Sequence, residues 1–487
     1  MGQENKILKS KATSDLQTAG YEDLLTHAGE WGTWQWRVWL AMWMPAMMAA
    51  MATLSWVFTA FPVNCTPEDQ QNNTNSLSMS NDCGIVVCDS SVREDSIVLD
   101  LNLLCGREWL KALLAPVYML GMLFGAPVFG MLSDSFGRKR LVLVSILVVS
   151  VSGSMLVVMP RSLAWHAVFR FITGFGAGGS MVCTFVYLIE GPRRGRRWRL
   201  VAALGLHLGW NTGQAVLVVL AYVIRGWRLL QLVTHAASLA ALSLFFLVPE
   251  SPRWLISQGR LEEAKQVIRE MASANKKTLP CGALDSLVQP PIMQTGKIPR
   301  SLIQRLLVLS FQWFATNLCY YGIHYSSVQL YGDIYINFPL LMLAEVSANL
   351  FSHLVVLPSL GQKRYLGVCQ LLCSLVLLLS SAVPPSYHFL KIGLTLIGKF
   401  TATANFNCLY FYTCELFPTS IRSTTIGVCS TVGRLGAMVA LASVHLSWVS
   451  EMLPPVMMAA PAAAAHGDPA RHCALPESGQ ETIGIKT

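Results

Sequence analysis

Charged residues are scarce in this chain: Asp, Glu, Lys and Arg make up 13% of its 487 residues, while 53% are hydrophobic. A soluble globular domain carries about a quarter of its residues as charged side chains. Most of the chain is therefore not in contact with water, which excludes a cytosolic, nuclear or ribosomal globular protein. The apolar residues also come in blocks too long for a soluble core.

Catalytic and metal-binding patterns are lacking as well. No nucleophile triad, metal-ligand cluster or phosphate-binding glycine loop stands out in the sequence, so we expect no enzyme, no bound metal and no cofactor. The glycine-rich run at 174–179 lies inside an apolar stretch. Small residues at such a place favour close helix packing rather than nucleotide binding.

Eleven apolar stretches of about 18–27 residues are present, each long enough to cross a hydrocarbon core of about 30 Å as a helix. They lie at 36–61, 110–132, 141–159, 163–189, 200–224, 229–248, 306–323, 337–358, 365–383, 389–412 and 423–447. A twelfth candidate at 452–474 is weaker, because prolines interrupt it and Asp468 and Arg471 would be costly in lipid. The sequence predicts an all-α integral membrane protein with a lipid bilayer as its environment.

The charge distribution predicts the orientation of the chain, because loops that are translocated are poor in Lys and Arg. Residues 62–108 hold eight acidic residues against two arginines, so we expect this loop outside the cell. Basic residues cluster at 137–140, 193–199 and 250–300, which we expect in the cytosol. The polar N-terminus, without an apolar core and cleavage site, should also be cytosolic. The net charge of +9 is thus explained by topology in a multi-pass plasma-membrane protein, and we expect no nucleic-acid partner.

The outer loop also carries an even number of cysteines. Cys65, Cys83, Cys88 and Cys105 lie in an oxidising compartment if this topology holds, so we expect two disulfides, with three pairings possible. Two N-glycosylation sequons begin at Asn64 and Asn72 in the same loop.

An internal repeat divides the chain into two halves. Four short motifs recur in the same order at offsets of 224 to 229 residues. The pairs are 137–139 with 361–363, 170–171 with 399–400, 190–196 with 415–422, and 249–251 with 476–478. We therefore predict two homologous six-helix halves, the last span being degenerate.

The repeat and the topology together predict the domain organisation. We expect a cytosolic N-terminus at 1–35, a six-helix half at 36–248, a central cytosolic segment at 249–301, a second six-helix half at 302–474 and a cytosolic tail at 475–487.

Two parallel six-helix halves describe the major facilitator architecture, in which substrate binds between the halves near the midplane. Residues 130–140 resemble the loop signature of that superfamily, although Ser135 stands where a basic residue is usual. The resemblance implies that Asp134 lies at a helix end and helps to latch the halves on the cytosolic side. The residues that it assigns to gating are Asp134, Gly137, Arg138, Arg170, Glu190, Lys399, Glu415 and Arg422.

Within that superfamily the chain resembles solute carrier family 22, the organic ion transporters, over nearly its whole length. The resemblance is carried by 29–35 (Gly-Glu-Trp-Gly-Thr-Trp-Gln), the cysteine-bearing outer loop with 96–98 and 104–105, 249–255 (Pro-Glu-Ser-Pro-Arg-Trp-Leu), 320–322 (Tyr-Tyr-Gly) and 406–422. It implies a transporter of small organic ions that works by alternating access, and the eroded loop signatures mark a divergent member.

Arg434, near the middle of the eleventh apolar stretch, is the main candidate for substrate binding. A charge at the centre of a membrane helix costs about 2.5–3.5 kcal/mol and needs a compensating partner. In the family that the chain resembles, this position is Arg in organic-anion and carnitine-type members and Asp in the organic-cation branch. A guanidinium binds a carboxylate or sulfate bidentately, so organic anions are the expected substrates. The alternative is an internal ion pair, for instance with Glu345.

The resemblance also implies an aromatic lining, whose faces would stack on flat organic anions. The residues that align with cavity-lining aromatics of anion carriers are Tyr222, Tyr320, Tyr321, Phe406 and Tyr410. Two other functions stay open. One is a carrier of carnitine-like zwitterions or organic cations, and the other is a membrane receptor or scaffold that does not transport.

Overall fold

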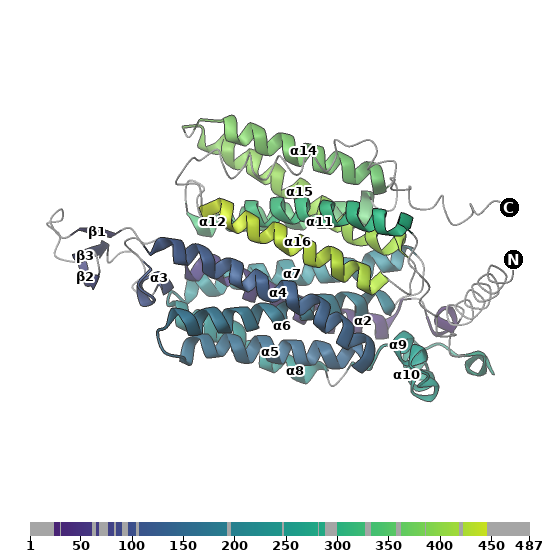
Figure 1. Cartoon of the computed structure of the whole chain (residues 1–487). Helices are drawn as coiled ribbons and strands as arrows, with labels where there is room; N and C mark the ends of the chain where they lie inside the picture. Colours follow the sequence, from purple (N-terminus) through teal and green to yellow (C-terminus); the bar gives the residue numbers. More distant parts are fainter. Residues whose placement is uncertain are drawn as a thin grey trace.

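The fold is a bundle of long helices with a small sheet at one end (Figure 1). The computed structural model describes residues 24–29, 31–60, 65–67, 76–81, 84–89, 96–103, 107–191, 196–245, 248–280, 282–287, 300–326, 333–356, 362–384, 386–417 and 422–445. The predicted twelfth span at 452–474 lies outside these residues.

A helix covers each of the eleven predicted apolar stretches. These helices are α2 (Thr33–Thr59), α4 (Glu108–Phe136), α5 (Arg138–Val158), α6 (Leu163–Glu190), α7 (Arg196–Val223), α8 (Trp227–Phe245), α11 (Arg300–Ser326), α12 (Ile334–Phe351), α14 (Gln362–Ala382), α15 (His388–Leu416) and α16 (Arg422–His445). Within the described part of the chain, eight helices are long and apolar enough to cross a membrane by length and composition. The other three helices on predicted stretches, α8, α11 and α15, are not among these eight.

Helix packing repeats the division seen in the sequence. In the first half α2 packs on α7, and α6 packs on both α4 and α5. In the second half α11 packs on α16, and α15 packs on both α12 and α14. The same three pairings therefore recur in the same chain order. The halves meet where α16 lies against α4 and α12 lies against α7 (Figure 1).

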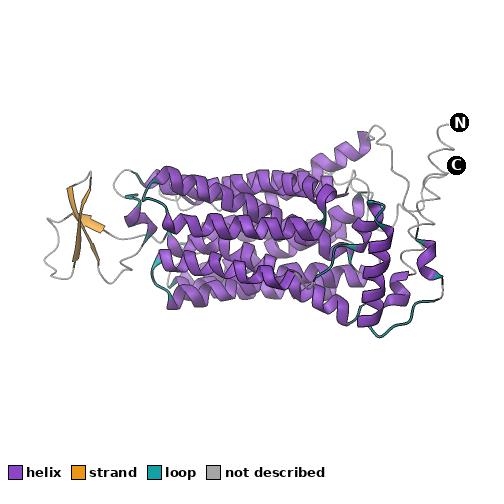
Figure 2. Ribbon diagram, turned by 90° about the horizontal axis from the view of Figure 1, so that it is seen from below, coloured by secondary structure: helices purple, strands orange, loops and turns teal. Residues whose placement is uncertain are grey.

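The outer loop contains a sheet that the sequence interpretation did not include. Strands β1 (Cys65–Pro67), β2 (Ser76–Asn81) and β3 (Gly84–Asp89) form an antiparallel sheet in the order β1-β3-β2. The β-branched run in β3 favours an extended backbone. Figure 2 shows this sheet beyond the end of the helix bundle.

The register of this sheet bears on the predicted disulfides. Cys65 of β1 lies opposite Cys88 of β3. Cys83, Cys105 and both sequon asparagines, Asn64 and Asn72, lie outside the described residues. The short helix α3 (Ile97–Asp100) follows the sheet, and Ser96 caps its start by accepting a hydrogen bond from the Val98 amide.

The segment between the halves lies at the opposite end of the bundle (Figure 1). It contains α9 (Pro252–Ser257), α10 (Leu261–Ala274) and a single 3-10 turn, η2 (Ala283–Ser286). Ser251 caps α9, accepting a hydrogen bond from the Trp254 amide, and a proline stands in the first turn. On the exposed face of α10, the hydrogen bond and charge of Lys265 lower the pKa of Glu262.

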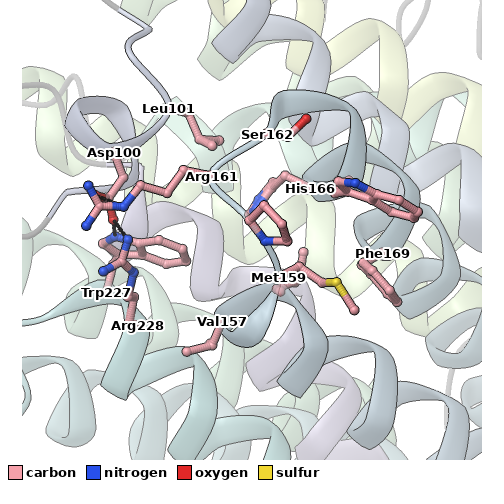
Figure 3. A pocket seen from close by; sticks show the side chains of 13 residues that line it. Asp100, Leu101, Val157, Met159, Arg161, Ser162, His166, Phe169, Trp227 and Arg228 are labelled. Atoms are coloured by element: carbon pink, nitrogen blue, oxygen red, sulfur yellow. Dashed lines mark hydrogen bonds and ion pairs between the residues drawn. The ribbon is translucent and has the colours of Figure 1, made fainter.

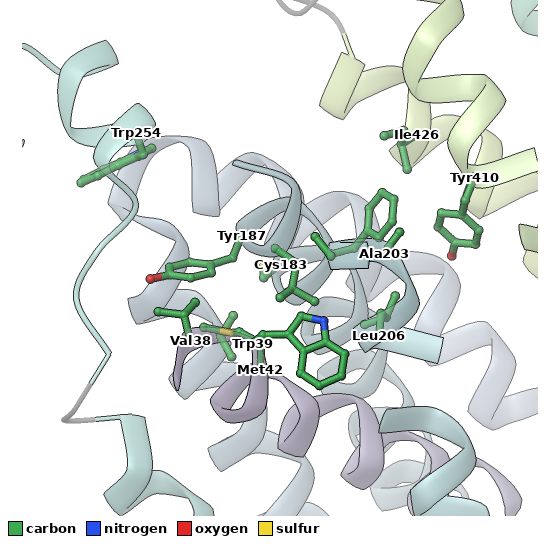
Figure 4. Packing of buried hydrophobic residues seen from close by; sticks show 14 of the residues in the cluster. Val38, Trp39, Met42, Cys183, Tyr187, Ala203, Leu206, Trp254, Tyr410 and Ile426 are labelled. Carbon is green, nitrogen blue, oxygen red and sulfur yellow. The ribbon is translucent and has the colours of Figure 1, made fainter. Parts of the chain in front are cut away.

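Buried apolar residues from both halves pack together near this end (Figure 4). Trp39 and Met42 of α2 and Cys183 of α6 form the part from the first half. Tyr410 of α15 and Ile426 of α16 belong to the same cluster. The two halves therefore share one apolar contact layer in this conformation. A π-helical turn, η4 (Ser352–Val356), continues α12 at this end.

Close contact between α4 and α6 depends on glycine. A Cβ added at Gly174 would overlap the backbone carbonyl of Tyr118 on α4. The glycine-rich run 174–179 therefore packs helices, as the sequence predicts, because small residues let two membrane helices approach closely.

We predict that Gly174→Val strongly destabilises the protein, because its side chain would push α4 and α6 apart. The matched control is Gly393→Val on α15, where an added Cβ meets no atom within 4 Å. The readout is the thermal unfolding temperature of the two purified variants. Equal unfolding temperatures for Gly174→Val and Gly393→Val would contradict the packing argument.

Candidate substrate site

A small pocket lies between the two halves. Its lining comes from α6 and α7 of the first half and from α11, α12, α15 and α16 of the second. The lining residues are Met181, Leu206, His207, Trp210, Tyr320, Tyr321, Glu345, Asn349, Thr403, Phe406, Asn407, Tyr410 and Arg434. The space left inside is about 20 Å³, which holds little more than one water molecule. An organic ion can therefore enter only after the halves move apart.

Arg434 is buried in this pocket, with 3% of its surface exposed. Its Nη1 donates a hydrogen bond of 2.6 Å to the Tyr321 hydroxyl, and its Nη2 lies 4.0 Å from the Met181 sulfur. Its Nε is buried without a hydrogen-bond partner. Among the described residues no carboxylate lies within ion-pair distance of this guanidinium. Arg434 thus retains a buried Nε–H donor with no anionic partner among the described residues.

Glu345 has a different partner from the one considered in the sequence analysis. Its carboxylate lies 3.0 Å from the amine of Lys399, on α15, rather than beside Arg434. Tyr320 and Gln214 also donate hydrogen bonds to it, of 2.8 and 3.2 Å. The Lys399 amine lies 3.5 Å from the Tyr320 ring centroid and is fully buried. The negative charge of Glu345 is therefore balanced within the second half.

Five of the six predicted substrate-binding residues line the pocket. Tyr320 and Phe406 stack with ring centroids 5.2 Å apart and planes 24° apart, and Phe406 lies 5.1 Å from Tyr410. Tyr321 packs edge-on against Tyr320. These rings form one side of the site.

Tyr222 is the sixth predicted residue, and the structure places it elsewhere. Its side chain is 64% exposed near the C-terminal end of α7 and packs edge-on against Tyr335, 5.6 Å between centroids. It does not belong to the pocket lining. Sequence alignment fixes its helix but not the direction of its side chain.

Several polar lining residues were missed in the sequence analysis. Asn407 donates a hydrogen bond of 2.7 Å to Asn349, which in turn donates one of 2.6 Å to Asn211 across the two halves. The His207 ring lies 5.1 Å from that of His353. The signal that could have found them is the occurrence of Asn and His inside apolar stretches, where polar groups must find partners.

Four of the predicted gating residues gather at one end of the bundle. Arg138 makes an ion pair with Asp134 and another with Glu190, the latter at 3.1 Å. Gly137 joins α4 to α5 with φ of +108°, and a Cβ there would overlap the Glu250 carboxylate. These described partners lie within the first half, and the latch between the halves that Asp134 is expected to provide stays a prediction.

The same network extends into the segment that follows the first half. Ser251 donates a hydrogen bond of 2.6 Å to Glu190, and the Trp254 indole donates one of 2.8 Å to the Asp134 carbonyl. The network therefore ties α4, α5 and α6 to α9. It can hold the first half rigid while that half moves against the second.

The other predicted gating residues are not part of this network. Arg170 and Lys399 are both buried inside the bundle, with 2% and 0% of their surfaces exposed. Glu415 lies on α15 and Arg422 begins α16, but their side chains lie outside the described part of the structure. Among the described residues no group of three or more His, Cys, Asp or Glu could hold a metal ion.

Contacts between the halves exist on both sides of the pocket. Near the sheet, the Tyr325 hydroxyl donates a hydrogen bond of 3.0 Å to the Thr53 carbonyl, and that of Tyr335 donates one of 3.1 Å to Ala221. On the other side, Phe185 packs against Tyr410 at 5.0 Å. The pocket is therefore enclosed in this conformation.

A bundle of two similar halves around a central pocket defines a membrane transporter of the major facilitator fold. The solved proton:xylose symporter XylE of E. coli superposes with a TM-score of 0.65 at 14% identity, covering 91% of this chain and 96% of that one. The human organic anion transporter MFSD10 superposes with a TM-score of 0.59 at 14% identity, covering 91% and 99%. At such low identity these structures establish the fold alone.

The sequence comparisons establish the family. Residues 37–444 match the "Sugar (and other) transporter" family, and the chain belongs to it, within solute carrier family 22. Solute carrier family 22 member 4 of Mus musculus is 32% identical, covering 76% of this chain and 68% of that protein. The human organic cation/carnitine transporter 2 is 31% identical, covering 74% and 66%. The chain therefore spans about two thirds of these two relatives.

We predict that the single variant Lys399→Met is less thermally stable than the double variant that carries both Lys399→Met and Glu345→Gln. The single change leaves a buried carboxylate without its cation, which costs about 3–5 kcal/mol, whereas the double change removes both charges. The measurement is the unfolding temperature of both variants and of Glu345→Gln alone. Additive effects of the two substitutions would show that the pair is not coupled.

Proposed function

We propose that this protein transports small organic anions across the membrane by alternating access, with Arg434 binding the anionic group of the substrate. The observation that carries the proposal is the buried guanidinium, which has a tyrosine and a thioether beside it and no carboxylate among the described residues. A carboxylate or sulfonate matches its donor geometry and would supply the missing negative charge.

The charge balance at the pocket supports a negatively charged substrate. Arg434 and Glu345 line the pocket with one charge of each sign, and Lys399 outside the lining pairs with Glu345 at 3.0 Å. With Glu345 held by Lys399, Tyr320 and Gln214, the net positive charge belongs to Arg434. An anion entering the pocket therefore neutralises it, whereas a simple cation would add to it.

The rings of Tyr320, Phe406 and Tyr410 supply the second element of recognition. They are adjacent in the pocket, at about 5 Å between neighbouring centroids, and come from two helices of one half. An aromatic anion could stack on them while its charged group contacts Arg434. Trp210 and His207 reach the same pocket from the first half, so a bound substrate would contact both halves.

A second candidate is a carnitine-like zwitterion, favoured by the presence of Glu345 in the same pocket as Arg434. Its carboxylate would bind Arg434 and its cation would approach Glu345, in competition with Lys399. Two relatives bear the names solute carrier family 22 member 4 and organic cation/carnitine transporter 2. Uptake of labelled carnitine separates this candidate from the first.

We predict that Arg434→Ala and Arg434→Asp abolish uptake of a labelled aromatic carboxylate at normal surface level, because the counter-charge is lost or reversed. Arg434→Lys should keep part of the uptake, since the charge remains but the bidentate geometry does not. Tyr321→Phe removes only the hydroxyl that accepts from Arg434 and should raise KM more than it lowers the maximal rate.

The control is Arg269→Ala, which removes an exposed arginine of α10 far from the pocket lining. It should transport like the unchanged protein. Normal anion uptake by Arg434→Ala at normal surface level would refute the assignment of Arg434.

For the outer loop we propose a plasma-membrane topology with residues 62–108 outside, glycosylated at Asn64 and Asn72. The sheet register favours Cys65–Cys88 among the three disulfide pairings, leaving Cys83 with Cys105. Cα atoms of opposed antiparallel residues lie about 4.5–5.5 Å apart, within the span of a disulfide. Peptide mapping under non-reducing conditions should recover these two disulfide pairs. Labelling of the loop by a reagent that reaches only the cytosolic side would contradict the proposed topology.

A further inference from the structure

Arg170 on α6 is a second buried guanidinium, and its surroundings differ from those of Arg434. Its exposed fraction is 2%, and its guanidinium carbon lies 4.3 Å from the Trp56 ring centroid and 5.4 Å from that of Tyr118. Its Nε is buried without a hydrogen-bond partner. Among the described residues no carboxylate lies within ion-pair distance of it.

Aromatic faces do not offset the cost of this burial. A cation–π contact contributes about 0.5–2 kcal/mol, whereas removing one charge from water without a counter-ion costs several kcal/mol. The Nε–H donor of the guanidinium also lacks an acceptor, which adds about 1–3 kcal/mol. The protein therefore needs a negative partner at this position.

The internal repeat shows which partner is missing. Lys399 stands in the second half where Arg170 stands in the first, at an offset of 229 residues. Lys399 is neutralised by Glu345 on α12, the helix that packs on α15 as α4 packs on α6. On α4 the side chain that faces Arg170 is the phenol ring of Tyr118. The first half thus has the cation of the repeated pair and a neutral phenol in place of the acid.

Other buried polar groups close to Arg170 also lack partners. The Nε2 atom of His166, one turn earlier on α6, is buried and unbonded in a residue that is 5% exposed. His235 on α8 interacts electrostatically with Arg170, and one turn before it both amide atoms of Gln231 are buried and unbonded. Gln231 is fully buried. The Gln231 amide nitrogen on α8 and, in its Nε2–H tautomer, the His166 ring on α6 are therefore further N–H donors near the guanidinium.

A pocket at the sheet end of the first half leads to His166 (Figure 3). At its mouth the Asp100 carboxylate accepts a hydrogen bond of 2.6 Å from the Trp227 indole and pairs with Arg228 at 2.8 Å and Arg161 at 3.7 Å. Two arginines against one aspartate leave the mouth positive. The free space is about 20 Å³, enough for one water or a halide ion and too small for an organic ion.

We propose that a chloride-sized monovalent anion binds beside His166 in this pocket, one helical turn from Arg170 on α6, and supplies the negative charge that Glu345 supplies in the second half. The site is separate from the central pocket, since Arg170 and His166 do not line that pocket. Tyr118, whose ring faces Arg170, is hydrogen-bonded to the Thr53 hydroxyl, and the Thr53 carbonyl accepts a hydrogen bond from Tyr325 of the second half. A bound anion would therefore stabilise the enclosed conformation.

The test is the thermal unfolding of the purified full chain in sodium chloride and in sodium gluconate at equal concentration. Chloride should raise the unfolding temperature saturably, by about 2 °C or more, and bromide should act like chloride. Gluconate is too large for the site and controls for ionic strength. Equal unfolding temperatures in the two salts across the whole concentration range would overturn the proposal.

Variants locate the effect. Arg170→Gln should lose the chloride shift, and His166→Ala should raise the half-saturating chloride concentration about tenfold or more. Arg434→Gln and Arg269→Gln should both keep the shift, which makes failure of this proposal distinguishable from failure of the substrate assignment. A chloride shift that survives in Arg170→Gln refutes the site. If Arg170→Gln does not fold, His166→Ala decides: an unchanged half-saturating chloride concentration in that folded variant refutes the site.

Discussion

Neutralisation of buried positive charge is the constraint on which this structure depends. Three cations, Arg170, Lys399 and Arg434, lie inside the bundle with at most 3% of their surfaces exposed. Water does not solvate a charge at this depth, so each of these cations destabilises the fold unless an opposite charge lies beside it. Lys399 meets Glu345 within its own half. Arg170 and Arg434 have no described carboxylate, and both proposals of anion binding follow from that difference.

The helical framework gives these charges their positions. Glycine contacts bring α4 and α6 close together, which places Tyr118 against Arg170. The ion pairs of Arg138 hold the end of the first half as one unit with α9. The contacts that must break for the central pocket to open are those between halves, including Tyr325 with Thr53 and Phe185 with Tyr410. They are single hydrogen bonds and ring contacts, weaker than the ion-pair network within the half.

Much of this architecture was predictable from the sequence, because apolar length and repeated motifs report directly on membrane crossing. A helix lies on each of the eleven apolar stretches within the described residues, and the repeat appears again in the pairing of helices. Arg434 was identifiable for the same reason, since a lone charge in an apolar stretch is costly. The partner of Glu345 could not be predicted from the sequence. Both Lys399 and Arg434 lie in apolar stretches of the second half, and only the packing of the helices shows that Lys399 is the partner.

Other features depend on side-chain direction or on weak local signals. Tyr222 has the residue type and helix of a lining residue, yet its side chain is exposed. The sheet in the outer loop has strands of three to six residues, too short to stand out against a loop rich in Ser and Asn. The network of Asp134 was predicted to help join the two halves; its described members are Arg138 and Glu190 of the first half and Trp254 of α9, in the segment that follows that half.

The most direct test of the central claim is binding of three ligands of one shape and different charge to the purified protein. An aromatic carboxylate, its carboxamide and the corresponding amine differ in the group that would meet Arg434 while offering the same ring to Tyr320 and Phe406. The account predicts that the carboxylate binds at least about tenfold more tightly than the carboxamide, since a charge-assisted pair contributes roughly 1.5–3 kcal/mol, and that the amine binds least. Equal affinity for the three ligands, or tightest binding of the amine, would contradict it.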